Sequence, residues 1–226
     1  MAHRETWFVL LLALCVLTTP GCSDPEAEGL AVSLQTDFVP GVEFDRVRAT
    51  VDDARAFELE TDASDSYVRP RPITTYRGLE PGRRDVEVTL WEGARQVAAR
   101  RVSMEFRGSL LLNVVIARTC AGVVCDDDET CVAGACVSPR CVTGEERECP
   151  RAQCASPADC TASTMCVEPS CIAGICLETG GDTCAVSEVC VPDTGCVPRG
   201  TAHDAGLRDA SLDAPTLDAP PPDAPG

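Results

Sequence analysis

Hydrophobic and polar side chains alternate with a period of two along much of residues 30–118. This alternation predicts half-buried β-strands, because successive side chains of a strand point to opposite faces of a sheet. The runs that show it are Val32–Leu34, Val47–Val51, Phe57–Leu59, Val86–Leu90 and Val102–Phe106. A final run, Leu110–Ile116, is almost wholly apolar and predicts a central strand.

Turn-forming residues separate these runs. They are Pro40-Gly41, Pro81-Gly82, Glu92-Gly93 and Gly108, and Pro70 and Pro72 are expected to interrupt the chain between the early and late strands. About seven strands in about 90 residues are typical of a two-sheet β-sandwich. Two aromatic residues are candidate contact residues if exposed, Tyr76 and Trp91, although a tryptophan beside a turn is more often a packed edge aromatic.

Cysteine dominates the chain from residue 119 to 198. Of the 16 cysteines, 14 lie there, whereas Phe106 is the last aromatic residue. Three groups of four share a central C-x5-C spacing, and one pair is left over. The groups are Cys120, Cys125, Cys131, Cys136; Cys154, Cys160, Cys166, Cys171; and Cys176, Cys184, Cys190, Cys196; the pair is Cys141 and Cys149. Glycines before several of them indicate tight turns, so the pattern predicts small repeat modules.

Disulfide bonds are the expected state of these 14 cysteines. Zinc sites use compact pairs such as C-x2-C, often with histidine, and this segment has neither. A redox enzyme needs a C-x-x-C pair with an activated thiolate, which is also missing from the sequence. Spacing does not reveal which cysteines pair, since four cysteines alone allow three connectivities.

The N-terminus, "MAHRETWFVLLLALCVLTTPGC", has a charged start and then an apolar run from Trp7 to Leu17. The run is shorter than the roughly 20 residues that span a bilayer, so it predicts a secretory signal peptide over residues 1–21. A linker is expected over residues 22–29. Removing Cys15 with the signal leaves Cys22 and the 14 clustered cysteines.

The end of this segment resembles the lipobox of bacterial lipoproteins. The resemblance implies that Cys22 is lipidated, for example with palmitate, and becomes the first residue of the mature chain. Several acyl chains hold a protein stably on a membrane without spanning it. The alternative is ordinary signal cleavage nearby, which leaves Cys22 as a further disulfide partner. Lipidation leaves an even number of cysteines for disulfides.

Two further resemblances concern larger parts of the chain. The stretch "RGLEPGRRDVEVTLWEGARQVAARRVSMEF" resembles the last strands of bacterial immunoglobulin-like and carboxypeptidase-regulatory-like domains. The complete layout, which ends in five Asp-Ala pairs, resembles cysteine-rich predicted lipoproteins of myxobacteria, and this implies no established activity. The expected fold is therefore mainly β: an Ig-like sandwich (30–118), disulfide-rich repeat modules (119–198) and a disordered Asp/Ala/Pro-rich tail (199–226).

Charge and composition narrow the function. The formal net charge of −17 disfavours binding to nucleic acid. The chain has no lysine, its only histidines are His3 and His203, and no familiar catalytic motif appears. Asp52 with Asp53 is a candidate carboxylate pair, and residues 126–129 are a candidate calcium site, but both stretches are more typical of solvated turns.

The sequence thus predicts a non-catalytic binding or structural module with no cofactor, held on the bacterial cell envelope by its lipid, at the outer membrane or cell surface rather than the inner membrane. An extracellular or periplasmic protein is a further expected partner. The alternative is a protease inhibitor, in which Arg140, Arg147 or Arg151 serves as bait for a trypsin-like enzyme.

Overall fold

A computed structural model describes residues 29–53, 55–141, 149, 151–181 and 183–199 of the chain. Within these ranges the protein is mainly β, as predicted, and its helical structure is limited to two short 3-10 turns, η1 (Arg118–Cys120) and η2 (Pro157–Asp159). No helix in the described ranges is long and apolar enough to cross a bilayer. Two regions follow each other along the chain: a two-sheet region (residues 29–117) and a cystine region (residues 118–199).

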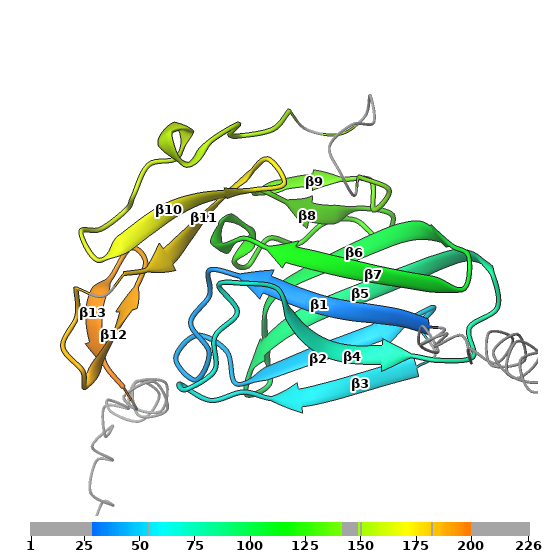
Figure 1. Cartoon of the computed structure of the whole chain (residues 1–226), viewed down its shortest axis with the longest axis horizontal. Coiled ribbons are helices and arrows are strands. Elements are labelled where there is room, and N and C mark those ends of the chain that lie inside the picture. Colours follow the sequence, from blue (N-terminus) through cyan, green and yellow to red (C-terminus); the bar gives the residue numbers. More distant parts are fainter. Residues whose placement is uncertain (1–28, 54, 142–148, 150, 182, 200–226) are drawn as a thin grey trace, which may run out of the picture.

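The two-sheet region contains seven strands in two hydrogen-bonded sheets (Figure 1). The four-stranded sheet has the order β3-β2-β5-β6, and the three-stranded sheet has the order β4-β1-β7. The strands are β1 (Gly29–Thr36), β2 (Arg46–Val51), β3 (Arg55–Glu60), β4 (Arg71–Tyr76), β5 (Gly82–Glu92), β6 (Arg95–Phe106) and β7 (Ser109–Ile116).

The alternating positions form the core between these sheets. In the antiparallel pair of β2 and β5, Val47 lies opposite Leu90 and Val51 lies opposite Val86, and all four are buried. Neighbouring positions along the same strands face outward because side chains alternate between the two faces. Side chains of both sheets join in one buried cluster that also contains Phe44 and Tyr67. Burial of apolar area therefore holds the two sheets together.

Strand β4 corrects the expected break at Pro72, whereas Pro70 lies between β3 and β4, outside both strands. Pro72 lies within β4 and is paired with Ser33 of β1, at a point where the register shifts between Val32 and Ser33. A proline is tolerated there because β4 is the outermost strand of its sheet, and its nitrogen need not donate to a neighbour. On the other side of β1, β7 pairs in parallel, so the sheet is mixed.

The cystine region contains three antiparallel hairpins. They are formed by β8 (Thr130–Val132) with β9 (Ala135–Val137), β10 (Val167–Ile172) with β11 (Ile175–Gly180), and β12 (Glu188–Val191) with β13 (Gly195–Pro198). The first two hairpins turn through Ala133-Gly134 and Ala173-Gly174, with positive φ at both residues of each pair. Two-residue turns with this geometry match the twist of the flanking strands, which explains the glycines before the cysteines.

The cystine region packs against the two-sheet region. Along β6, Ser103 donates its backbone N–H to the carbonyl of Pro139, and Arg101 donates its own to the hydroxyl of Thr130. The β6 edge of the four-stranded sheet is thereby partly covered, which satisfies some of its otherwise open hydrogen-bonding groups. Figure 1 shows the three hairpins following one another around one side of the two sheets.

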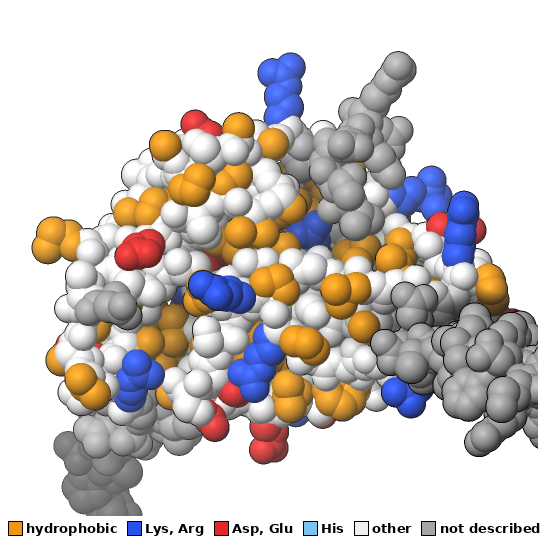
Figure 2. Space-filling view, in the orientation of Figure 1, with side chains coloured by type: hydrophobic (Ala, Val, Ile, Leu, Met, Phe, Trp, Pro, Cys, Tyr) orange, Lys and Arg blue, Asp and Glu red, His pale blue; other side chains and the backbone are white. Residues whose placement is uncertain are grey.

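A small apolar cluster fills the junction between the regions. Val115 of β7 and Ala117, just after that strand, pack with Val132 of β8 and with Ile175 and Leu177 of β11. Hydrophobic side chains on the face seen in Figure 2 lie interspersed with arginine and acidic side chains.

Candidate functional site

All 14 clustered cysteines are joined in seven disulfides, which confirms the predicted disulfide bonding. The bonds are Cys120–Cys131, Cys125–Cys136, Cys141–Cys149, Cys154–Cys171, Cys160–Cys176, Cys166–Cys190 and Cys184–Cys196. The left-over pair of the sequence, Cys141 and Cys149, forms its own bond.

The pairing follows one rule at all three hairpins. Each hairpin carries two cysteines directly opposite each other, at Cys131 and Cys136 in the first. These two do not bond to each other; the first bonds the earlier of two upstream cysteines, and the second bonds the later one. The same order holds for the other two hairpins, with opposed cysteines at 171 and 176 and at 190 and 196.

The second and third cysteine groups of the sequence are not separate disulfide units. Cys160 bonds Cys176, and Cys166 bonds Cys190, so both bonds join the two groups. Cys166 lies within the chain segment spanned by the second hairpin's bonds but belongs to the third hairpin. The two later hairpins are therefore cross-linked to each other. Spacing alone concealed this because one cysteine of the third hairpin's set, Cys166, lies in the sequence among the cysteines of the second hairpin's set.

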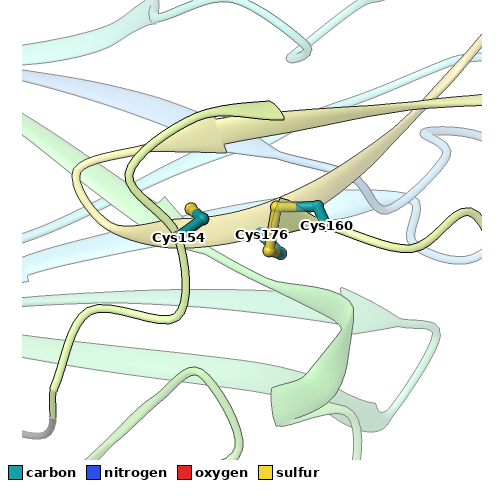
Figure 3. Close-up of side chains that lie close together, drawn as sticks. All are labelled: Cys154, Cys160 and Cys176. Atoms are coloured by element: carbon teal, nitrogen blue, oxygen red, sulfur yellow. A yellow bond between two sulfur atoms is a disulfide. The ribbon is translucent and has the colours of Figure 1, made fainter. Parts of the chain in front are cut away.

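Two groups of three sulfur atoms lie close enough to suggest a metal site, each with its atoms within 4.8 Å of one another. Figure 3 shows one group, in which Cys154 lies beside the Cys160–Cys176 disulfide. Cys154 is bonded to Cys171. Zinc binds thiolates, and a sulfur atom in a disulfide is not a thiolate. The proximity reflects neighbouring disulfides rather than a metal-binding set.

The two acidic candidates of the sequence, residues 126–129 and the pair Asp52 and Asp53, belong to no set of three close metal-ligand groups among the described residues. Asp126, Asp127 and Asp128 are exposed, and the only sets of three close metal-ligand groups among the described residues are the two cysteine sets. Asp52 accepts hydrogen bonds from Arg84, at 2.9 Å, and from the backbone of Asp85. Its carboxylate therefore holds the turn after β2 and is not paired with another carboxylate.

The two aromatic contact candidates have different positions. Tyr76 is buried, and its hydroxyl donates to the carbonyl of Ala49 at 2.8 Å, so it belongs to the core and is not a surface contact. Burial raises the pKa of Tyr76 to about 12. Trp91 is half-buried on the outer face of the four-stranded sheet. Its indole N–H donates to the hydroxyl of Thr89 at 2.7 Å.

Of the arginines considered as protease bait, Arg140 and Arg151 are exposed. Arg140 lies in a turn in which Cys141 donates its backbone N–H to the carbonyl of Ser138. Arg147 lies outside the described residues, as do Cys22, the expected signal peptide (1–21) and almost all of the expected tail.

A hollow of about 290 Å³ lies at the junction of the two regions. Asp37 and Tyr67 line it from the two-sheet region, and Thr179, Val189 and Arg199 line it from the cystine region. Arg199 also donates to the carbonyl of Ala63 at 3.1 Å. Small-molecule sites often lie between such units. The hollow is therefore a candidate binding site.

Asp37 is the buried acid of this junction, with 6% of its surface exposed. Its two carboxylate oxygens accept the backbone N–H of Arg118, at 2.7 Å, and of Glu178 in β11, at 3.1 Å. Burial raises the pKa of Asp37 to about 6, against the opposing effect of these two hydrogen bonds and of the Arg118 charge. One side chain thus joins the end of β1 to the second hairpin.

Arg118 adds a second link at the same place. Its guanidinium group contacts both carboxylate oxygens of Glu43, donates to the carbonyl of Asp37 at 3.1 Å and lies 5.2 Å from the ring centre of Phe38. Burial is the largest single effect on the pKa of Arg118 and lowers it. The hydrogen bonds and the charge of Glu43, with smaller effects of other carboxylates, outweigh burial, so the pKa is raised. The sequence carried no signal for this network, because its members are about 75 to 80 residues apart.

Two other buried polar groups lie near the junction. The hydroxyl of Tyr67, a residue with 1% exposure, has no hydrogen-bond partner. Arg100 is 5% exposed and donates to the carbonyls of Val115 and Cys141, and burial lowers its pKa to about 10. Arg100 therefore ties the start of the Cys141–Cys149 loop to β7.

Comparison with protein families, with curated proteins and with solved structures found no match for the chain.

Proposed function

We propose that this protein is an exported lipoprotein that is anchored in the bacterial envelope through Cys22 and acts as a non-catalytic binding or structural module. One observation carries the proposal: the seven disulfides use every cysteine between residues 120 and 196. Disulfides persist in exported proteins and are rare in a reducing cytosol. The disulfides therefore support export, and both the lipid anchor and the place in the envelope depend on export.

The pairing also explains why Cys22 is available for lipid. A chain that begins at Cys22 contains 15 cysteines, and 14 of them are paired with each other. Cys22 is the remaining one, and it follows the apolar N-terminal run at the position that resembles a lipobox. A thioether-linked lipid uses this cysteine and leaves no reactive thiol.

The architecture supports a role in binding or structure rather than catalysis. The two-sheet region is proposed to be an Ig-like sandwich, and the three hairpins, with their shared pairing rule, are proposed to be copies of one module. Contacts such as Asp37 with Glu178 hold the two regions against each other. Such a body presents a fixed surface away from the membrane. Binding to such a surface then requires no conformational change.

The test is the intact mass of the protein extracted from its native membrane, before and after reduction and alkylation. We expect a chain that starts at Cys22 and carries acyl mass, and that gains 14 alkyl groups only after reduction. A Cys22→Ala variant is expected to leave the membrane fraction with its seven disulfides intact. Free thiols before reduction contradict the export part of the proposal, and an unlipidated Cys22 contradicts the anchor.

A further inference from the structure

A second hollow, of about 270 Å³, lies on the outer face of the four-stranded sheet. Strands β2, β5 and β6 and the turn after β2 supply its lining, which is mostly polar. The lining residues are Arg48, Thr50, Asp53, Glu87, Thr89, Trp91 and Gln96. The strand register brings these side chains together, because Arg48 lies opposite Thr89 and Trp91 lies opposite Gln96. Its volume is close to the lower end of the range for small-ligand sites, about 300–1,000 Å³.

Trp91 is a fixed aromatic platform at one side of this hollow. Its indole N–H is bound to Thr89, which is itself buried beneath it at 6% exposure. The guanidinium carbon of Arg46 lies 5.6 Å from the ring centre, so a second group restricts the ring. A register shift in the β5–β6 pair falls between Leu90 and Trp91. A ligand that stacks on such a ring does not have to order it first.

The polar side chains around the platform have spare hydrogen-bonding capacity. Within the described residues, Thr50, Asp53 and Gln96 make no side-chain hydrogen bond to the protein. The charged groups are only loosely paired: Arg48 lies 3.8 Å from Glu58, and Glu87 lies 3.6 Å from Arg101. Donors and acceptors therefore face the hollow without strong partners. A hydroxyl-rich ligand can exchange its bonds to water for bonds to these groups.

The lining of the hollow carries one positive charge, Arg48, and two negative ones, Asp53 and Glu87, and further charged groups lie beside it. Together with these neighbours, Arg46, Arg48 and Arg101 supply three positive charges, and Asp53, Glu58 and Glu87 supply three negative ones. An anionic ligand meets two carboxylates in the lining and a protein of net charge −17. The electrostatics thus disfavour an anionic ligand.

We propose that this hollow binds a neutral oligosaccharide, with one sugar ring stacked on Trp91 and its hydroxyls bonded to Arg48, Glu87 and Gln96. An aromatic ring beside planar amide, guanidinium and carboxylate groups matches a pyranose ring, which has an apolar C–H face and a rim of hydroxyls. The inference deepens the proposed binding module by naming a ligand class. It does not depend on the lipid at Cys22.

The test is calorimetric titration of the full protein with three neutral trisaccharides, built of glucose with α-links, of glucose with β-links and of N-acetylglucosamine. A trimer of galacturonic acid serves as the charged comparison. We expect saturable binding of at least one neutral probe and no binding of the acidic one. In a chain that starts at Cys22, Trp91 is also the one tryptophan, so its fluorescence should change with the same saturation curve.

Variants locate the binding. Trp91→Ala should weaken it by about tenfold or more, as loss of a central aromatic anchor does. Gln96→Ala, which removes one uncharged hydrogen-bonding group from the rim, should weaken it by about two- to tenfold. The matched control is Glu105→Ala, an exposed change on the same strand outside the hollow, which should leave affinity unchanged.

Three results overturn the inference: no binding of any neutral probe, preference for the acidic trimer, or binding that both Trp91→Ala and Gln96→Ala leave intact. None of these results affects the mass measurement at Cys22. The anchor and the ligand class therefore stand or fall separately.

Discussion

The two-sheet region and the cystine region are both built from paired β-strands, yet different forces hold them. The first buries one continuous cluster of large side chains, among them Phe44, Tyr67 and Phe106. The second contains no aromatic residue, and among its described residues the buried apolar side chains belong to two small clusters. The comparison shows that similar strand geometry can rest on apolar burial or on covalent links.

The two forces act on different states of the chain. Burying a valine or leucine side chain favours the folded state by about 1.5–3 kcal/mol. A disulfide acts mainly by restricting the unfolded chain, and a closed loop of about 15 residues contributes about 3 kcal/mol in the chain-entropy model. The seven bonds here join residues 8 to 24 positions apart. Each region therefore has its own point of weakness.

Reduction of all seven disulfides should produce the largest difference in stability between the two regions. We expect the hairpins β8 to β13 to lose their amide protection against hydrogen exchange, while β2 and β5 keep theirs, because only the first set depends on cross-links. Hydrogen exchange followed by mass spectrometry, with and without reductant, measures this. Simultaneous loss of protection in both regions would show instead that the contacts along β6 make them one cooperative unit.

Truncation of a core side chain should destabilise the two-sheet region. Leu90→Ala removes a side chain with no exposed surface and should lower the free energy of unfolding by about 2–5 kcal/mol. The control is Leu111→Ala, at a position that is 70% exposed, with an expected change within about 0.5 kcal/mol. Denaturant titration under oxidising conditions gives both values. Equal effects of the two variants would refute the apolar core as the source of stability.

The pKa of Asp37 reports on the contact between the two regions. We expect a pKa of about 6, above the usual value near 3.8, because burial disfavours the ionised carboxylate. The folded state then binds the proton more tightly than the unfolded one. This residue's contribution to stability therefore falls as pH rises from about 4 to about 6, by about 3 kcal/mol in total.

Carbon NMR of the aspartate carboxyl groups measures this pKa directly. Exposed Asp62 is the internal reference, since its hydrogen bonds with Ser64 lower its pKa. A value for Asp37 near 4 would mean that the two backbone N–H groups outweigh burial.

Glycine substitutions should produce the smallest effects. Gly174 has a φ of 77°, and an added Cβ would lie 2.8 Å from the Cβ of Ala152, whereas Gly122 has a φ of 65° with open space around it. Gly122→Ala is expected to cost about 1 kcal/mol from backbone strain alone. Gly174→Ala should cost about 2–3 kcal/mol, because steric overlap adds to the strain. Thermal unfolding of both variants, with disulfides intact, compares their stabilities. An equal loss of stability would show that the backbone near Ala152 shifts to accommodate the added Cβ.

Several features were readable from the sequence because they depend on local spacing. Val47, Ala49 and Val51 alternate with polar residues, so their strand and its buried face follow from the period of two. The disulfide state followed from composition, since no zinc-type spacing or nearby histidine offered another use for the cysteines. The strand at Pro72 was missed because the tolerance of a proline depends on whether its strand lies at the edge of a sheet.

The period of hydrophobic side chains and the cysteine content were enough to predict that the chain is mainly β and that its second half contains disulfides, because both are properties of neighbouring residues. The bond of Cys166 to Cys190, rather than to a cysteine of its own group, depends instead on the folded chain. The packing of the folded chain also buries Tyr76 in the core and brings Asp37 to Glu178 across 141 positions. Such outcomes depend on which distant segments meet when the sheets and hairpins pack, and local patterns carry no record of that.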